Sequence, residues 1–177
     1  TATSEIPVHV EFFAGPEEIA KEKGELIKNL PANGFALLNY DDLTVLDFQT
    51  QTKAKVITYG FGEGADIQAS NYKLMFKNDI PKGIAFKIDY KKTSIPVKIS
   101  GGFGKPQVYA ALAGFATGLA LELNLVEISN LLSFYRPPPG RLKLIEGIKN
   151  SWIIDDSYNA SPMAMHEALD LLKNLPA

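Results

Sequence analysis

The chain has 177 residues and a mass of 19.4 kDa, which suffices for one ordinary domain with a hydrophobic core. Its 18 basic and 20 acidic residues leave a formal charge of −2, so no excess of positive charge attracts nucleic acid or anionic lipid. The absence of cysteine excludes disulfides and cysteine-bound metals, and no apolar run reaches the ~18 residues of a membrane span. These features predict a cytoplasmic protein with neither nucleic-acid partners nor membrane insertion.

The N-terminal part alternates a helix with buried strands. Residues 16–30 are predicted to form a helix, with Pro16 at the favoured first position and two glutamates near the positive end of the helix dipole. Residues 35–39 and 55–59 are short continuous apolar runs, typical of strands that are buried on both faces. This order indicates an α/β fold with a partial parallel sheet flanked by helices.

The pattern changes between residues 66 and 99. Three stretches there alternate apolar and polar residues and are separated by turn signals such as residues 78–83. The predicted strands are residues 67–76, 83–90 and 93–99. Alternation of this kind is typical of antiparallel strands with one face in water, so we expect a small three-stranded antiparallel sheet.

The last part of the chain returns to helices and short strands. Helices are predicted at 107–123, 126–134 and 162–173, and strands at 142–148 and 152–154. The tripled proline at 137–139 ends any helix there. Ser161 and Pro162 form a favourable N-cap and first position for the last helix. We therefore expect residues 1–177 to form a single α/β domain.

One lysine interrupts the amphipathic pattern of the first helix. Ile19, Leu26, Ile27 and Leu30 fall within an arc of roughly 100° that should face the core, and Lys23 lies inside this arc. One interpretation is a side chain whose stem packs on the core while the ammonium reaches outward. The other is an amine held inward, where it loses its proton more easily and can react with carbon dioxide or bind an anion.

The chain contains two histidines, His9 and His166. Neither lies at a spacing from another histidine or acid that is typical of metal sites. A lone histidine such as His9 is more often structural than a ligand. His166 lies inside a predicted helix, and we expect it on the surface or in packing.

Two glycine-rich loops, residues 61–64 and 101–106, are candidates for phosphate binding. Glu63 places a carboxylate where a phosphate would sit, and Pro106 stands where a Walker loop has serine or threonine. Neither loop is therefore a P-loop. The second loop precedes a helix whose N-terminus could face an anion, although a simple turn is the more common interpretation.

The strongest candidate for a ligand site is the segment of residues 152–162. An apolar strand leads there into Asp155, Asp156 and a polar loop before a helix, a position at which α/β sheets bind ligands. Because adjacent strand residues point to opposite sides, one of the two aspartates should face the ligand; a capping turn is the alternative. Upstream, Arg141 could clamp a phosphate with two hydrogen bonds or pair with a surface acid.

Taken in order, five motifs resemble the central, ATP-binding domain of the Mur ligases. They are His9-Val10-Glu11, Ala20-Lys21-Glu22-Lys23-Gly24-Glu25, Leu38-Asn39-Tyr40-Asp41-Asp42, Pro139-Gly140-Arg141-Leu142 and Ile154-Asp155-Asp156-Ser157-Tyr158-Asn159-Ala160-Ser161-Pro162. The last motif is most similar to that of family members that add D-alanyl-D-alanine to a UDP-N-acetylmuramoyl tripeptide. The resemblance runs nearly end to end and includes residues 59–71. It implies the P-loop NTPase-like fold of the Mur ligase central domain.

The resemblance implies roles for six residues. It identifies Lys23 with a lysine that is carbamylated to give a magnesium ion a carboxylate ligand, and His9 with a histidine that helps to bind the same metal. It places Arg141 at the ATP phosphates and Asp156 near the nucleotide ribose. The weaker candidates in the same nucleotide-binding loop are Tyr158 and Asn159.

The resemblance also implies a reaction with ATP and Mg²⁺ as cofactors. In this family ATP phosphorylates the carboxylate of the UDP-linked peptide, and the amine of D-alanyl-D-alanine attacks the acyl phosphate to form an amide. Metal ions and cationic side chains neutralise the charge on the transferred phosphoryl group. The expected role is peptidoglycan precursor synthesis in the bacterial cytoplasm.

Two departures from the family pattern limit the transfer of roles. Gln107 and Ala110 fall within the family's His-Asn-x-x-Asn motif, whose second asparagine is lost at Ala110, so the adenine contacts are expected to differ. The Gly-Lys-Thr loop and the N-terminal UDP-binding and C-terminal domains are expected outside the chain, which should be inactive alone. The alternatives are an amide ligase of the same superfamily with another amino acceptor and a non-catalytic nucleotide-binding or interaction module.

Overall fold

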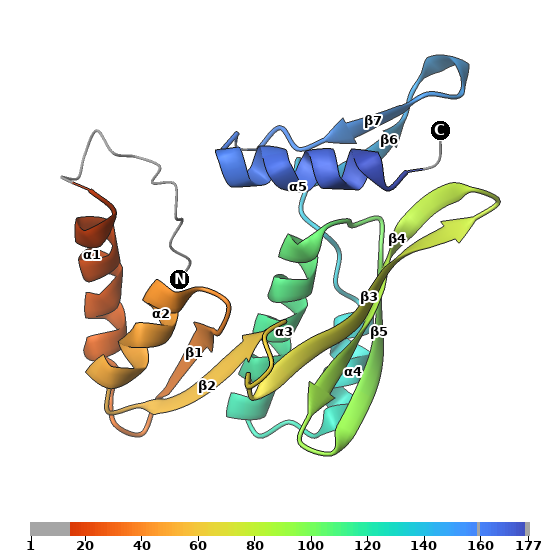
Figure 1. Ribbon diagram of the computed structural model, residues 1–177. Helices are drawn as coiled ribbons and strands as arrows, with labels where there is room; N and C mark the ends of the chain where they lie inside the picture. Colours follow the sequence, from red (N-terminus) through yellow and green to blue (C-terminus); the bar gives the residue numbers. More distant parts are fainter. Residues whose placement is uncertain (1–14, 159, 176–177) are drawn as a thin grey trace.

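The computed structural model describes residues 15–158 and 160–175. Within this range the strands form a five-stranded sheet in the order β1-β2-β3-β4-β5 and a two-stranded sheet of β6 and β7, with helices packed around both (Figure 1). The predicted α/β class, with parallel and antiparallel strands, is confirmed. None of the helices in these two ranges has the length and hydrophobicity needed to cross a lipid bilayer.

The elements follow one another closely along the chain. In order they are α1 (Pro16–Lys28), β1 (Phe35–Asn39), α2 (Leu43–Asp47), η2 (Phe48–Gln51), β2 (Lys55–Gly60), β3 (Ile67–Lys77), β4 (Ile80–Tyr90), β5 (Thr93–Ser100), α3 (Lys105–Ala120), α4 (Leu125–Ser133), β6 (Lys143–Glu146), η3 (Ile148–Asn150), β7 (Trp152–Asp155) and α5 (Pro162–Lys173).

Strands β1 and β2 are parallel, as predicted, and helices cover both of their faces. Alternate residues of β1 enter different cores because successive side chains of a strand point to opposite sides. Ala36 and Leu38 pack with Ile27 of α1 and with α2 and η2. Leu37 packs on the other side, in the core that includes α3. Burial on both faces explains the continuous apolar runs of these two strands.

The antiparallel strands β3, β4 and β5 continue the same sheet. β3 pairs with β2 in parallel through two residue pairs, Tyr59 with Ile67 and Gly60 with Gln68. The β3–β4 turn is shorter than predicted, because Asn78 and Asp79 alone make it with φ values of 52° and 58°. Two left-handed residues form the two-residue hairpin turn that matches the natural twist of the strands.

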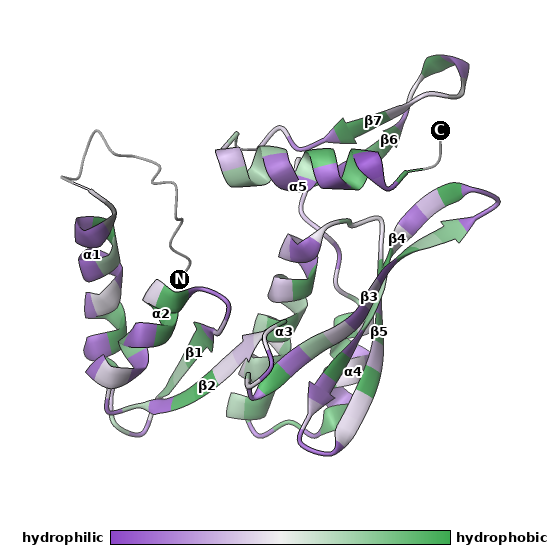
Figure 2. Cartoon of the chain, in the orientation of Figure 1, coloured by the Kyte–Doolittle hydropathy of each residue, from purple (hydrophilic) through white to green (hydrophobic). Residues whose placement is uncertain are grey.

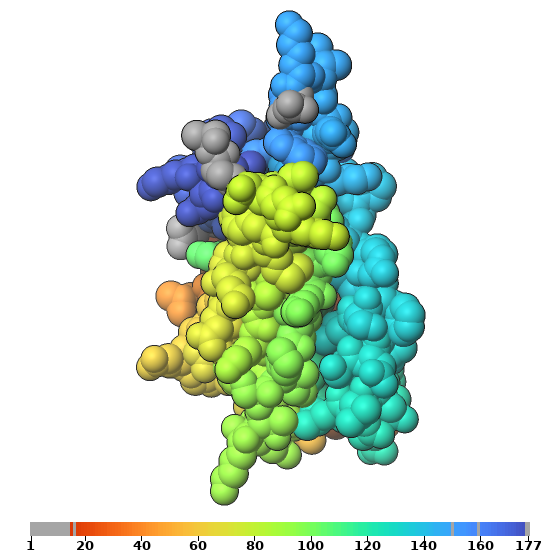
Figure 3. All heavy atoms as spheres, turned by 90° about the vertical axis from the view of Figure 1, so that its right-hand side faces the viewer, coloured from red at the N-terminus to blue at the C-terminus, as the bar shows by residue number. Residues whose placement is uncertain are grey.

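The antiparallel strands have one covered and one open face, as predicted. Buried and exposed residues alternate along β5, and the buried ones pack with the mostly apolar helix α3 and with α4. Figure 2 shows the contrast between the hydrophobic α3 and the mixed surface of α1. Figure 3 shows β3 to β5 in yellow and green, with α4 beside them.

Strand β7 belongs to the two-stranded sheet and not to the five-stranded one. Among the described residues it pairs with β6 alone, antiparallel, from Trp152 opposite Glu146 to Asp155 opposite Lys143. Helix α5 packs on this hairpin, and a small core of Phe103, Leu142 and Leu171 joins both to the main body. The candidate loop at 155–158 therefore belongs to a separate layer.

Two further details of the N-terminal part differ from the sequence prediction. Leu26 was placed in the core stripe of the first helix but is 64% exposed, whereas Ile27 is 7% exposed. The buried residues described in this helix are Gly24 and Ile27, and Gly24 lies against the ring of Phe48. The short helix α2 was not predicted, since its five residues are too few for a period, although Asp42 caps it by accepting a hydrogen bond from the Val45 amide at 3.1 Å.

Candidate functional site

Arg141, Asp156 and Tyr158 lie together in one corner, where the chain enters β6 and leaves β7. The amide of Leu142 donates to Asp156 Oδ1 at 3.0 Å, and the amide of Tyr158 donates to the Gly140 carbonyl at 3.1 Å. The guanidinium carbon of Arg141 lies 4.0 Å from the centre of the Tyr158 ring. Three of the six predicted site residues thus come together in space.

The backbone of this corner depends on Gly140. Its φ of 70° lies in the left-handed region that favours glycine. A Cβ at this position would lie 3.1 Å from the Tyr158 amide nitrogen and 3.3 Å from Ser157 Oγ. The buried side chain of Leu142 then anchors the segment in the core, so that Arg141 is held between two fixed positions.

Asp155 and Asp156 accept hydrogen bonds from different parts of the chain. Asp155 Oδ1 accepts hydrogen bonds from the Ser157 amide at 3.2 Å and from Ser157 Oγ at 2.6 Å. These bonds, aided by the charge of Lys143, hold the pKa of the Asp155 carboxyl below its usual range. Asp156 instead reaches across to the Leu142 amide. One carboxylate therefore shapes its own loop, and the other joins this loop to the arginine segment.

The predicted cap of the last helix is confirmed. Ser161 Oγ accepts a hydrogen bond from the Ala164 amide at 3.2 Å, with Pro162 at the start of α5. His166 is exposed on α5, as expected. The loop between β7 and α5 thus combines a capped helix start with the Arg141 corner.

Gln107, which stands at the first asparagine of the family's His-Asn-x-x-Asn motif, supports the corner from α3. Its side chain is buried, and its Nε2 donates to the Arg141 carbonyl at 3.3 Å. Its Oε1 accepts a hydrogen bond from the Tyr135 hydroxyl at 2.8 Å. Ala110, at the place of the second asparagine, is exposed on the same helix. Gln107 therefore fixes the backbone of the predicted phosphate-binding arginine.

Of the predicted metal-binding pair, Lys23 and His9, the structure describes Lys23. Lys23 lies on α1 and is partly buried, which agrees with its position inside the arc that faces the core. His9 and Asn159 lie outside the described residues. In residues 15–158 and 160–175, no three histidine or acidic side chains are grouped closely enough to hold a metal ion.

A second polar cluster lies at the carboxyl ends of β1 and β2. None of its residues is among the six to which the family resemblance assigns a role. Asp41 there accepts hydrogen bonds from two backbone amides of the 61–64 loop and from the hydroxyl of Tyr109. The sequence signal for this cluster is the position of Asp41 directly after a buried strand. Open α/β sheets bind their ligands at this edge.

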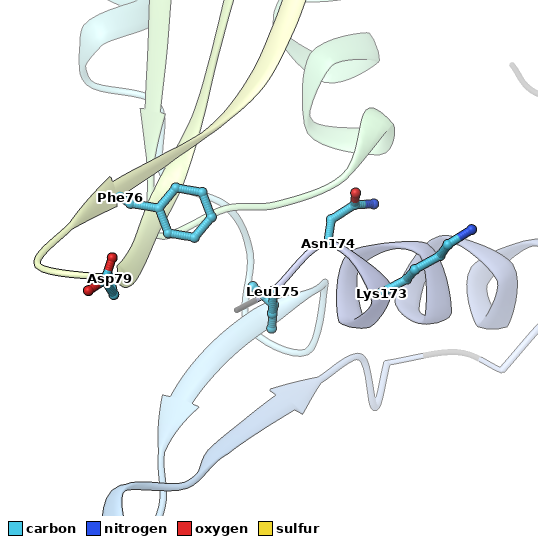
Figure 4. A pocket seen from close by; sticks show the side chains of 5 residues that line it. All are labelled: Phe76, Asp79, Lys173, Asn174 and Leu175. Carbon is cyan, nitrogen blue, oxygen red and sulfur yellow. The ribbon is translucent and has the colours of Figure 1, made fainter. Parts of the chain in front are cut away.

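Two hollows lie at the junction of the β3–β4 hairpin with α5. The first has a volume of about 440 Å³ and is lined by Phe76, Asp79, Lys173, Asn174 and Leu175 (Figure 4). Lys173 ends α5, and none of the predicted site residues lines this hollow. The second is lined by Lys105, Glu167 and residues of the hairpin and includes none of the predicted site residues.

Residues 4–118 match the family model described as the Mur ligase middle domain. The chain belongs to the Mur ligase family. Relatives with different acceptors match it about equally well. The UDP-N-acetylmuramoyl-tripeptide–D-alanyl-D-alanine ligase of Escherichia coli is 29% identical over 95% of this chain, and that of Rickettsia prowazekii is 32% identical over 96%. The UDP-N-acetylmuramate–L-alanine ligase of Hydrogenobaculum is 28% identical over 94%.

Solved Mur ligases share the fold of this chain. MurF from Acinetobacter baumannii superposes with a TM-score of 0.81 at 26% identity, over 96% of this chain and 36% of that protein. MurF from Thermotoga maritima, solved in complex with ADP, gives a TM-score of 0.80 at 25% identity, over 96% of this chain and 38% of that protein. The chain spans 36% and 37% of the length of the E. coli and Rickettsia relatives.

Proposed function

We propose that this chain is part of an ATP-dependent ligase that adds D-alanyl-D-alanine to a UDP-N-acetylmuramoyl tripeptide in the bacterial cytoplasm. The Asp155 to Pro162 loop supports this acceptor, because it is the motif most similar to that group of Mur ligases. Relatives named for L-alanine and for 2,6-diaminopimelate match with similar identity. The choice of D-alanyl-D-alanine as acceptor therefore depends on the sequence of this loop. We place the P-loop and the remaining ligase domains outside residues 1–177.

The observation that carries the proposal is the convergence of Arg141, Asp156 and Tyr158 in one corner. A guanidinium offers a rigid fork of N–H donors that matches phosphate oxygens, and an aromatic ring holds this cation through its face. The corner therefore fits the phosphate end of a nucleotide. The ADP-bound relative from Thermotoga supports the same ligand.

In this proposal the residues of the corner divide nucleotide binding and positioning between them. Arg141 binds phosphate oxygens of ATP, which supplies the phosphoryl group when bound. Asp156 holds the Leu142 amide and so fixes the backbone of the arginine, besides lying near the ribose. Tyr158 orients the guanidinium, and the neighbouring Asn159 belongs to the same nucleotide loop.

We further propose that Lys23 and His9 bind Mg²⁺. The amine of Lys23 would add to carbon dioxide, forming a nitrogen–carbon bond and releasing a proton, and the resulting carbamate would offer the oxygen ligands that Mg²⁺ prefers. A metal ion at this place would neutralise charge on the transferred phosphoryl group. The partial burial of Lys23 supports an inward-facing amine.

The experiment is a ligation assay of the full-length protein with ATP and each of three amino acceptors, every one offered with its own UDP-linked substrate. The pairs are D-alanyl-D-alanine with UDP-N-acetylmuramoyl tripeptide, L-alanine with UDP-N-acetylmuramate, and 2,6-diaminopimelate with UDP-N-acetylmuramoyl-L-alanyl-D-glutamate. We expect phosphate release with the first acceptor only. Arg141→Lys should raise the KM for ATP about tenfold or more, because lysine cannot make the two-donor contact. Arg136→Lys is the matched control, since Arg136 is exposed and its guanidinium donates to the carbonyls of Ser133 and Tyr135.

A non-catalytic nucleotide-binding module is the second candidate, and the exposed Ala110 is the observation that favours it. Such a module would bind ADP or ATP but release no phosphate with any of the three acceptors. Activity with L-alanine or diaminopimelate instead of D-alanyl-D-alanine would contradict the proposed acceptor and retain the ligase class.

A further inference from the structure

The glycine-rich loop that follows β2 binds a carboxylate of the chain itself. The amides of Phe61 and Gly62 donate to Oδ2 and Oδ1 of Asp41 at 2.6 and 2.8 Å. Asp41 follows β1, so this contact joins the carboxyl ends of two neighbouring parallel strands. An aspartate thus occupies the amides of a loop that resembles a phosphate-binding loop in composition.

The close approach of Asp41 and Tyr40 requires glycine in this loop. A Cβ at position 60 would lie 2.7 Å from Asp41 Oδ2, and a Cβ at position 62 would lie 2.9 Å from Asp41 Oδ1 and from the Tyr40 ring. These distances are too short for real side chains. Gly60 and Gly62 therefore let the loop close on the carboxylate.

Helix α3 supplies a third donor to the same carboxylate. The hydroxyl of Tyr109 donates to Asp41 Oδ2 at 2.8 Å, and its ring meets the Phe61 ring edge-on with the centroids 5.4 Å apart. Burial and the charge of Asp41 raise the pKa of Tyr109 well above its usual range. The hydroxyl therefore remains protonated and donates at neutral pH. Its hydrogen bond to Asp41 holds the start of α3 at the carboxyl ends of β1 and β2.

The opposite side of the same helix end contacts the Arg141 corner through Gln107. Gln107 precedes Tyr109 by two residues, which places their side chains roughly 200° apart around the helix. Gln107 donates to the Arg141 carbonyl at 3.3 Å. Asp41 is thus linked to the backbone of Arg141 in three steps. Asp41 bonds Tyr109, Tyr109 and Gln107 share the first turns of α3, and Gln107 bonds the Arg141 carbonyl.

We propose that Asp41 and Tyr109 are positioning residues of the ligase, whose hydrogen bond fixes the start of α3 and, through Gln107, the segment that carries Arg141. This inference rests on the proposed function. Neither residue has to touch ATP. Weakening the bond loosens the arginine segment and lowers the affinity for the nucleotide, while the amino acceptor is unaffected.

Tyr109→Phe tests the proposal, because it removes the hydroxyl and retains the ring. In the full-length protein we expect the KM for ATP to rise about five- to tenfold, as for the loss of one hydrogen bond, with the KM for the acceptor within twofold of wild type. Tyr90→Phe is the matched control, since Tyr90 is also half-buried and packs edge-on against Phe115. An unchanged KM for ATP in Tyr109→Phe overturns the proposal.

Asp41→Asn gives a second variant at the other end of the bond. An asparagine presents one acceptor oxygen where the carboxylate accepts three hydrogen bonds, and its NH₂ group faces another donor. We expect a larger rise in the KM for ATP than in Tyr109→Phe. In the double variant, Tyr109→Phe should add little further effect, because the two residues act through one contact. Fully additive effects would contradict the proposal.

Amide hydrogen exchange distinguishes a failure of this inference from a failure of the proposed function. Tyr109→Phe should speed exchange at Phe61 and Gly62, and also at Leu142, whose amide bonds Asp156 in the corner. This measurement needs no turnover. Faster exchange at the first two amides alone would overturn the link to Arg141. If the wild-type protein ligates nothing, the proposed function fails, while faster exchange at Leu142 still supports the link.

Discussion

The guanidinium of Arg141 stacks on the ring of Tyr158, with 4.0 Å between the guanidinium carbon and the ring centre. Tyr158 is 71% exposed, so this pair lies on the open side of the corner. A stacked guanidinium keeps the N–H groups at its edge available for an oxyanion. The tyrosine thus holds the arginine in place through its face rather than through its hydroxyl.

Tyr158 should therefore act through its ring. We expect Tyr158→Phe to keep the KM for ATP within twofold of wild type. Tyr158→Ala should raise it roughly two- to fivefold, since an exposed cation–π contact contributes about 0.5–1 kcal/mol. Steady-state kinetics of the full-length protein give both values. Equal losses in the two variants would point to the hydroxyl and contradict the stacking role.

Lys23 is predicted to be essential for ligase activity, because its side-chain nitrogen carries the proposed carbamate. We expect Lys23→Ala to lose most ligase activity, and short-chain carboxylic acids to restore part of it by replacing the carbamate oxygens at the metal. Lys28→Ala is the control, because Lys28 is an exposed lysine of the same helix that pairs with Glu25 at 3.0 Å. Wild-type activity in Lys23→Ala would remove the carbamate from the proposal.

Asp156 has a structural contact and a proposed nucleotide contact, which two substitutions separate. Asp156→Ala removes the acceptor of the Leu142 amide and should lower the free energy of unfolding by about 1 kcal/mol, besides raising the KM for ATP. Asp156→Asn retains an acceptor oxygen, so the stability should stay near wild type while the KM for ATP still rises. Urea unfolding and kinetics give the two quantities. Normal ATP kinetics in both variants would contradict the nucleotide role.

The lowered pKa of Asp155 predicts a pH dependence of stability. A carboxyl with a lower pKa in the folded state contributes stability above its unfolded pKa of about 3.9 and loses it as the pH falls through the folded value. Wild type should therefore exceed Asp155→Asn in Tm at pH 6, and the difference should shrink below about pH 3.9. Thermal unfolding across this range measures it. A difference that grows toward acid would show the opposite shift.

Local sequence signals determined most of the secondary structure. The Ser161 cap, the proline block at 137–139 and the apolar runs of β1 and β2 act over a few residues, so each predicts its element without knowledge of the rest. The resemblance of five motifs likewise anticipated the family that residues 4–118 match. No spacing rule places Arg141, Asp156 and Tyr158 together.

The tertiary structure alone decided which distant residues meet. The exposure of Leu26, the pairing of β7 with β6 and the contacts of Asp41 with the 61–64 loop and Tyr109 have no local signature. Each results from how whole elements pack, and a hydrogen bond between residues 41 and 109 forms only after the sheet and α3 are assembled. Local patterns set the conformation of each segment, whereas the burial of their shared faces sets which polar side chains meet at their ends.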